Sequence, residues 1–229
     1  VLCMIILAAG AVAAWLLERH YVGSARWTAM LAVITAGCVF AIWQYTSLYH
    51  FDELQVLIKV PWISFLNVEV LFAVDNLSLL MIWLTLVLAV VAILISWQEI
   101  STKAGFYYFN LLFAIVGILG VFIAMDMFLF FFFWEVMLLP MTALIAIWGH
   151  ENRHYAATKF FVYTQVSSLM MLIAIIFMSF IAGNQLNEVS FDYLAWQQLE
   201  LDDKTAFWLM LGFFVAFAVK LPAIPFHSW

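Results

Sequence analysis

Long stretches without charged side chains restrict most strongly how this chain can fold. Seven stretches of roughly 20 residues, the length that a helix needs to cross a membrane, are almost entirely apolar. They cover residues 1–17, 27–48, 77–97, 106–124, 127–148, 158–182 and 206–229. Hydrophobic residues make up 68% of the 229-residue chain and charged residues 10%, against about 45–50% and 25% in soluble domains. We therefore expect an all-α fold, a polytopic transmembrane helix bundle of about seven spans that forms one domain over residues 1–229.

Short polar breaks mark the ends of the expected spans. Residues 125–126 alone separate the fourth span from the fifth, which predicts a tight turn, because one helix of about 43 residues is too long for a hydrocarbon layer of about 30 Å. Asp75 or Asn76 is expected to cap the third helix. Gly149 begins a polar break after the fifth span, and residues 183–184 are expected to end the sixth.

The remaining composition excludes some classes of protein. Lys and Arg total 8 against 14 Asp and Glu, so the chain lacks the basic surface of a nucleic-acid-binding protein. Cys3 and Cys38 lie in apolar stretches and are expected to be buried thiols. The first stretch lacks the basic region and cleavage site of a signal peptide, and Val1 in place of Met suggests that residues precede it. The longer connections 49–76 and 183–205 are expected to carry short amphipathic pieces.

Basic residues are unevenly distributed between the two sides of the expected bundle. Loops 18–26, 98–105 and 149–157, together with Lys159, hold five Lys or Arg residues, whereas the connections on the other side hold two. Because cytoplasmic loops are enriched in Lys and Arg, we expect these loops in the cytoplasm and the N-terminus outside. The expected location is a lipid bilayer, the bacterial inner (cytoplasmic) membrane.

Glu135 is one of two charged residues inside the expected spans. It lies about 12 Å along its helix from Met127, near the middle of the layer, where a charged side chain costs at least about 2.5–3.5 kcal/mol to insert. Pro140 lacks an N–H group, so it frees the carbonyl of Val136 and opens a polar crevice beside Glu135. A charge at this depth predicts a functional site, and a structural ion pair is the alternative.

Lys220 is the second charged residue inside a span. Pro222 frees the carbonyl of Ala218 and Pro225 frees that of Leu221, so the last span is expected to be broken at Pro222/Pro225. Discontinuous helices with an ionisable group at the break are typical of ion-coupled transporters. A lysine whose proton affinity depends on a nearby carboxylate can serve a proton relay. A lysine that snorkels near a helix end is the alternative.

Helix spacing alone does not bring the two charges to one level. Both helices enter from the same side, and Lys220 is about 21 Å along its helix against about 12 Å for Glu135. His227, just after the break, can titrate in the range of proton transfer or serve as a structural hydrogen-bonding group. His150 and His154 have the spacing of one helix face, but no third ligand is evident, so we expect no metal site.

Two further charged residues have simpler interpretations. Asp126 is expected to be a turn residue, with a role at an external opening as the alternative. Lys159 is expected to snorkel at the cytoplasmic interface.

Three motifs around these residues resemble the subunit M family, antiporter-like membrane subunits of NADH:quinone oxidoreductase (respiratory complex I). They are FLFFFFWEVMLLPM at 128–141, AATKFFVYTQ at 156–165 and GFFVAFAVKLPAIPFHSW at 212–229. The resemblance is specific from about residue 75 onward. Family members have roughly twice as many helices, so it implies that this chain is the N-terminal half of such a subunit.

The resemblance also implies roles for individual residues. Glu135 matches the glutamate of the family's fifth helix, and Lys220 matches the lysine of its broken seventh helix, a pair whose separation drives protonation changes. His227 matches the histidine after the break. Protons would be pumped with redox energy released in other subunits, so we expect no cofactor in this chain. Flavin, iron–sulfur clusters and quinone would lie in the partner subunits of complex I.

The chain departs from the family pattern at a few points. Asn76 and Ser228 stand where the family usually has glycine. The eighth-helix lysine and the twelfth-helix ionisable residue, which complete the family's proton path, have no counterpart in this sequence.

Two other interpretations remain open at the level of the sequence. An antiporter subunit of a multi-subunit cation/proton exchanger, or of a membrane-bound hydrogenase, would share the glutamate, the lysine and the broken helix. A structural membrane scaffold would use Glu135 and Lys220 only to fix helix packing.

Overall fold

The computed structural model describes residues 1–47 and 54–228, which form mainly α-helices. The ends of the second and seventh expected spans, at Leu48 and Trp229, lie outside these residues. The helices are α1 (Leu2–Glu18), α2 (Ser24–Ser47), α3 (Asn76–Glu99), α4 (Ala104–Ile123), α5 (Met127–Val136), α6 (Leu138–Trp148), α7 (Arg153–Leu186), α8 (Tyr193–Trp196) and α9 (Asp203–Lys220). Strands β1 (Gln55–Ile63) and β2 (Val68–Val74) form a hairpin, and short 3-10 turns occupy Ser64–Leu66 and Phe226–Ser228.

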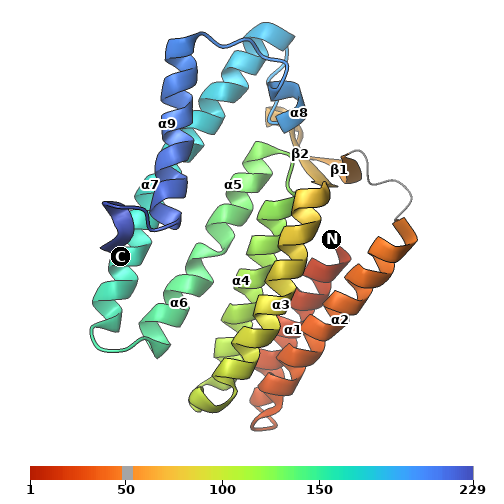
Figure 1. The fold of residues 1–229 in the computed structure, drawn as a ribbon, viewed down its shortest axis with the longest axis vertical. Coiled ribbons are helices and arrows are strands. Elements are labelled where there is room, and N and C mark those ends of the chain that lie inside the picture. Colours follow the sequence, from red (N-terminus) through yellow and green to blue (C-terminus); the bar gives the residue numbers. More distant parts are fainter. Residues whose placement is uncertain (48–53, 229) are drawn as a thin grey trace.

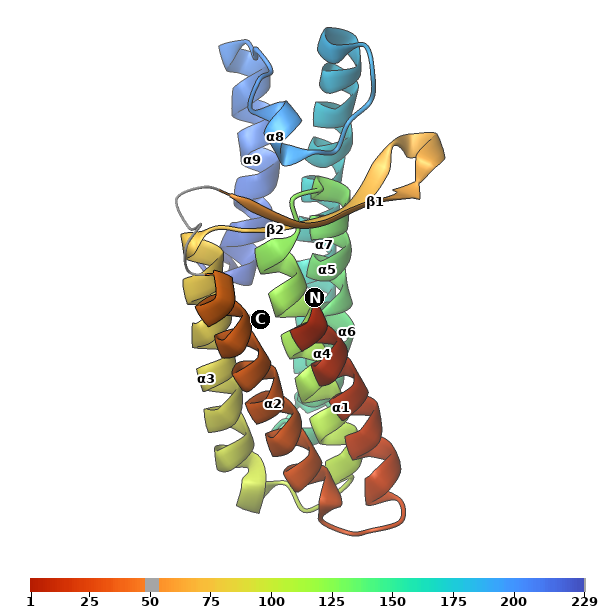
Figure 2. The ribbon, with the colours of Figure 1, turned by 90° about the vertical axis from the view of Figure 1, so that its right-hand side faces the viewer.

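The helices are arranged in three groups. Helices α1 to α4 pack together at one edge of the molecule, α5 and α6 follow one another through the middle, and α7 lies beside α9 at the other edge (Figure 1). The α1–α2, α3–α4 and α6–α7 connections lie at one end of the bundle, and the hairpin crosses at the opposite ends of α1 to α4, with α7 and α9 extending beyond it (Figure 2). The loops that share an excess of basic residues in the sequence thus share one end of the fold.

Five helical segments of the described chain are long and apolar enough to cross a membrane. They are Ser24–Thr46, Asn76–Glu99, Ala104–Ile123, Met127–Trp148 and Arg153–Leu186. Helix α1 is a shorter apolar helix of 17 residues, and the 18-residue α9 carries Asp203, Lys204 and Lys220. Large apolar side chains on these helices face outward, as Leu80 and Ile95 do with 61% and 62% of their surfaces exposed. This surface suits lipid and confirms a membrane helix bundle.

Several helix ends follow from local sequence signals. The Asp75 carboxylate accepts a hydrogen bond from the Ser78 N–H at 2.7 Å and caps α3, which confirms the first of the two expected caps. Only residues 124–126 separate α4 from α5. The helix that continues from α5 into α6 is interrupted at Met137, because Pro140 has no N–H group to continue the hydrogen-bond ladder.

The expected end of the sixth span at residues 183–184 is wrong. Helix α7 continues to Leu186 and ends at Asn187, which adopts the left-handed conformation with φ 63°. Asn tolerates this conformation better than most residues and so can end a helix. Gly183 instead allows a close approach, since a Cβ there would lie 3.3 Å from Val189 Cγ2.

The β1–β2 hairpin is the main element that the all-α expectation omits. Its strands pair antiparallel from Gln55 with Val74 to Ile63 with Val68, with two irregularities in the register. Val is frequent in both strands, with Ile and Trp in β1 and Phe in β2, and these residues favour strands. Asn67 in the left-handed region (φ 54°) closes the turn. The connection 49–76, in which short amphipathic pieces are expected, therefore contains a two-stranded sheet.

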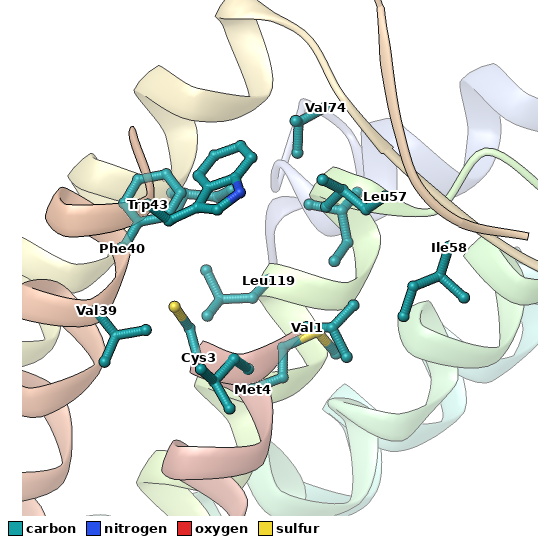
Figure 3. A pocket seen from close by; sticks show the side chains of 13 residues that line it. Val1, Cys3, Met4, Val39, Phe40, Trp43, Leu57, Ile58, Val74 and Leu119 are labelled. Carbon is teal, nitrogen blue, oxygen red and sulfur yellow. The ribbon is translucent and has the colours of Figure 1, made fainter. Parts of the chain in front are cut away.

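A mostly apolar cavity of about 250 Å³ lies under this hairpin (Figure 3). Side chains from α1, α2, α3, α4 and both strands line it, including Cys3, Phe40, Leu57 and Leu119. The Cys3 thiol is half-buried and donates to the carbonyl of Ala36 at 3.4 Å. Cys38, by contrast, is exposed, so only one of the two thiols is partly buried as expected.

Small residues let α1 approach α2 closely. A Cβ built on Gly10 of α1 would overlap the Cβ of Ala32 on α2, whereas a Cβ on Gly37 of α2 meets nothing within 4 Å. Close packing of small residues is a main source of helix association in membranes, where the hydrophobic effect between helices is absent.

We predict that Gly10→Ala lowers the stability of the chain and Gly37→Ala does not. Gly10→Ala forces two backbones apart, at a cost of about 1–3 kcal/mol. Gly37→Ala adds a methyl group in open space and improves helix propensity by up to about 1 kcal/mol. Thermal unfolding of both variants in detergent measures the difference. Equal melting temperatures for the two variants would contradict the packing described.

Candidate functional site

Glu135 lies one residue before the end of α5 and next to the buried Trp134. Its side chain is half-buried, and the interruption at Met137 follows two residues later. The Pro140 ring therefore places a break in the helix within one turn of this carboxyl group.

Lys220 is the last residue of α9, and its side chain reaches toward α5. Its Nζ atom lies 4.8 Å from the centroid of the Trp134 ring, a cation–π distance. Phe217, one turn earlier on α9, packs edge-on against the same ring with centroids 5.4 Å apart. After Lys220 the chain leaves the helix, and the Ala223 N–H donates to the carbonyl of Ala218 at 2.8 Å. The tryptophan thus joins the ends of α5 and α9.

The Lys220 ammonium lies over the ring of the residue that precedes Glu135. In the described part of the chain, no salt bridge within 4.0 Å joins the two groups. The two helices do not begin at one level as the sequence-based depths assume: α9 begins well beyond the hairpin, whereas α5 begins beside it (Figure 2). The extra length of α9 brings Lys220 to the level of Trp134.

His227 lies in the 3-10 turn that follows α9 and is exposed. Among residues 1–47 and 54–228, no hydrogen bond or ion pair joins it to Glu135 or Lys220. Its neighbour Ser228 accepts a hydrogen bond through its carbonyl from Lys159 Nζ at 2.9 Å. Lys159, expected to snorkel, therefore ties the segment after α9 to the first turns of α7.

Asp126 has a larger structural role than the turn residue that we expect from the sequence. It is buried, with 1% of its surface exposed. Its Oδ1 atom accepts hydrogen bonds from the N–H groups of Phe128 and Leu129, both at 2.9 Å, and caps α5. Its Oδ2 atom accepts from the N–H of Glu69 in β2 at 3.0 Å. One carboxylate thus fixes the first turn of α5 and holds the hairpin to it.

Backbone and ionic contacts complete this junction. Met125 donates its N–H to the carbonyl of Leu71 at 2.9 Å, and Met127 donates to Phe191 at 2.8 Å. The Lys59 ammonium lies 2.9 Å from a Glu69 oxygen and 3.7 Å from an Asp192 oxygen. These bonds raise the pKa of Lys59. The hairpin, the start of α5 and the connection before α8 are therefore one hydrogen-bonded unit, which we call the α5 junction.

The sequence contains a weak signal for the α5 junction. An acidic residue in a two-residue connection between apolar helices is a good N-cap candidate. Its bond to Glu69 links positions far apart in the chain, so it depends on a hairpin that the apolar pattern does not reveal.

Metal ligands do not gather in the described chain. His150 and His154 are both exposed, and no group of three or more His, Cys, Asp or Glu residues within 1–47 and 54–228 could hold a metal ion.

Known proteins share both sequence and fold with this chain. The family model described as NADH:quinone oxidoreductase/Mrp antiporter, TM, matches residues 124–229. NADH-quinone oxidoreductase subunit M of Pseudomonas aeruginosa is 43% identical over 229 residues, covering 94% of this chain and 45% of the relative. This chain belongs to that family. The resemblance inferred from the three motifs is thereby confirmed, and the chain spans about half the length of the curated relatives that it matches.

Solved structures show the same fold. A chain of respiratory complex I from Thermus thermophilus with bound NADH matches with a TM-score of 0.81 at 24% identity, covering 100% of this chain and 45% of that chain. A chain of the Mrp complex from Dietzia sp. DQ12-45-1b matches with a TM-score of 0.76 at 18% identity, covering 100% of this chain and 24% of that chain.

We predict that two substitutions of Asp126 separate its two roles. Asp126→Asn keeps one carbonyl oxygen for the cap of α5 but presents an amide NH₂ to the Glu69 N–H. Asp126→Ala removes both acceptors, and the lost cap alone costs about 1 kcal/mol. Hydrogen exchange should rise at Glu69 in both variants, and at Phe128 and Leu129 only in the alanine variant. Equal exchange at Phe128 and Leu129 in both would contradict this division.

The pH dependence of stability gives a second test of Asp126. Burial raises its pKa above the ordinary value of 3.8, although hydrogen bonds from Glu69, Leu129 and Phe128 oppose this. The folded state therefore holds the proton more tightly than the unfolded state, so stability falls as pH rises from 3.8 through the folded pKa and is constant above it. Asp126→Asn should lack this fall in thermal unfolding between about pH 3.5 and 7. If the thermal stabilities of the wild type and Asp126→Asn changed in parallel with pH, this result would contradict the assignment of the fall to Asp126.

Proposed function

We propose that this chain forms the N-terminal part of a proton-translocating membrane subunit of an NADH:quinone oxidoreductase. The name and 43% identity of the Pseudomonas aeruginosa relative support this function. Redox chemistry would occur in other subunits, which would hold the flavin, the iron–sulfur clusters and the quinone. The partners would be the other membrane subunits, the lipid bilayer and the protons that are moved.

The proposed relay consists of Glu135, Lys220 and His227. The observation that carries it is the position of the Lys220 ammonium 4.8 Å from the ring centre of Trp134, the residue before Glu135. An acid and a base from different helices would then lie close together in an apolar setting. Each group favours the charged form of the other when they are close, so a change in their separation would move a proton onto or off the relay.

The end of α9 would supply the mobility that such a relay needs. We propose that the seventh span is broken at Pro222/Pro225 and that the chain after Lys220 lines a wet cavity, since irregular backbone at membrane depth needs polar partners. His227 would then pass protons between Lys220 and the segments that follow.

We further propose seven spans, with α1 and α9 crossing the membrane beside the five longer segments, in a single transmembrane domain over residues 1–229. A 17-residue helix is about 25 Å long, close to the thickness of the hydrocarbon layer. The shared end of loops 18–26, 98–105 and 149–157 would face the cytoplasm of a bacterium, and the N-terminus would lie outside the inner membrane.

A cation/proton exchanger subunit is the second candidate. The TM-score of 0.76 with a chain of the Mrp complex supports it, and a membrane-bound hydrogenase subunit belongs to the same class. Dependence of transport on Na⁺, with no coupling to NADH oxidation, would favour the exchanger.

We predict that Glu135→Gln in the full-length subunit lowers proton pumping about tenfold or more, since a lost acid–base group costs about 10²–10⁴ in rate. The measurement is the acidification of inverted membrane vesicles per NADH oxidised. Glu135→Asp should restore part of the pumping. Glu151→Gln, a carboxylate in the exposed α6–α7 connection, is the matched control and should pump like the wild type.

Assembly of the complex separates the proposal from the scaffold interpretation. Normal assembly with lost pumping supports the relay. Normal assembly with full pumping would exclude Glu135 from it, and failed assembly of Glu135→Gln but not of Glu151→Gln would favour a scaffold role.

A further inference from the structure

We propose that Trp134 is a positioning residue of the relay, whose ring holds the Lys220 ammonium whenever that group is separated from the Glu135 carboxylate. This role rests on the proposed function, because it gives a defined position to one of the two states of the Glu135–Lys220 pair. The ring would act through Lys220 and would not itself carry a proton.

The Lys220 ammonium lies on the tryptophan ring and is not paired with the carboxylate. Its Nζ atom is 4.8 Å from the centroid of the Trp134 ring, within the distance of about 6 Å at which the negative face of an aromatic ring attracts a cation. Across residues 1–47 and 54–228, the ion pairs closer than 4.0 Å are both made by Lys59. This arrangement therefore corresponds to the separated state of the pair.

The Trp134 ring is held in place from both helices. Only 9% of its surface is exposed. Phe130, one turn earlier on α5, stacks against it with ring centroids 5.9 Å apart and planes inclined by 27°. Phe217 of α9 packs against it edge-on, with centroids 5.4 Å apart. These aromatic contacts restrict the ring, and a cation–π contact is strongest where water is excluded, so the ring is a fixed site for the ammonium.

The ring and the carboxylate offer Lys220 two alternative positions. Consecutive residues of an α-helix point about 100° apart, so Trp134 and Glu135 do not face the same way. Lys220 is the last residue of α9, and its flexible four-carbon stem allows the ammonium to move from one group to the other by rotation about its own bonds.

A partner for the separated ammonium lowers the cost of opening the ion pair. A charge removed from its partner in an apolar setting is strongly unfavourable unless another group compensates it. The Trp134 ring supplies such compensation, since a cation–π contact favours the charged form of the lysine. We therefore expect the strength of the ring's attraction for a cation to affect how readily the relay changes state.

Fluorinated tryptophan at position 134 of the full-length subunit tests this role. Fluorine withdraws electron density from the ring face with little change in shape, so each added fluorine weakens the attraction for a cation. We expect proton pumping by inverted membrane vesicles to fall with each fluorine, by about tenfold for the tetrafluorinated ring, while the complex assembles normally. Trp134→Phe keeps a weaker aromatic face and should pump better than Trp134→Leu.

The same fluorinated series at Trp196 is the matched control. Its ring is as buried as that of Trp134, with 8% of the surface exposed, and in the described part of the chain no Lys or Arg lies over it. Fluorine at this position should therefore leave proton pumping unchanged.

Several outcomes would overturn the role of Trp134. These are pumping that fluorine at position 134 does not change, pumping that fluorine lowers equally at both positions, and equal pumping by Trp134→Phe and Trp134→Leu. Loss of assembly on fluorination would indicate a packing role and would overturn it as well.

Glu135→Gln separates the role of Trp134 from the relay itself. Lost pumping in Glu135→Gln, together with no effect of fluorine at position 134, would overturn only the role of Trp134. Full pumping in an assembled Glu135→Gln complex would overturn the proposed relay, and with it the role of Trp134.

Discussion

The need to satisfy every backbone hydrogen bond away from water determines most of this structure. In an apolar layer an unpaired N–H or C=O group costs several kcal/mol, so the chain must be helical wherever it crosses. Where a helix ends, other groups must pair with its terminal N–H and C=O groups. At the α5 junction the partners are Leu71, Phe191 and the Asp126 carboxylate. The same requirement holds the end of α3, where the Ile100 carbonyl accepts from Arg26.

Features that depend on nearby residues were predictable from the sequence. The long apolar stretches indicate the main helices, since a spanning helix makes its backbone bonds internally. Asp75 caps α3 because its carboxylate reaches an N–H three residues later. Pro140 interrupts its helix because it lacks one donor. The relative positions of Glu135 and Lys220 were not predictable, because they depend on how far α9 extends past the start of α5.

Features that depend on residues distant in the chain could not be predicted from the sequence. The sequence places residues 49–76 in a connection, but the pairing of β1 with β2 depends on contacts between strands that this composition does not specify. The cap at Asp126 was within reach of a local argument, but its bond to Glu69 joins positions 57 residues apart. The end of α7 was also mispredicted. Gly183 allows close contact with Val189 and does not end the helix, whereas Asn187 provides the left-handed residue that does.

Helix α5 is held at its start by the α5 junction and ends at an interruption. Its first turn is bonded to the hairpin on one side and to the connection before α8 on the other, whereas its far end is weakened at Met137. Glu135 lies nine residues from the pivot at Asp126, an arm of about 13 Å. A tilt of about 10° about Asp126 would displace the carboxyl group by about 2 Å, whereas the first turn would stay bonded at the α5 junction. This displacement is comparable to the difference in distance between an ion pair in direct contact and one separated by a water molecule.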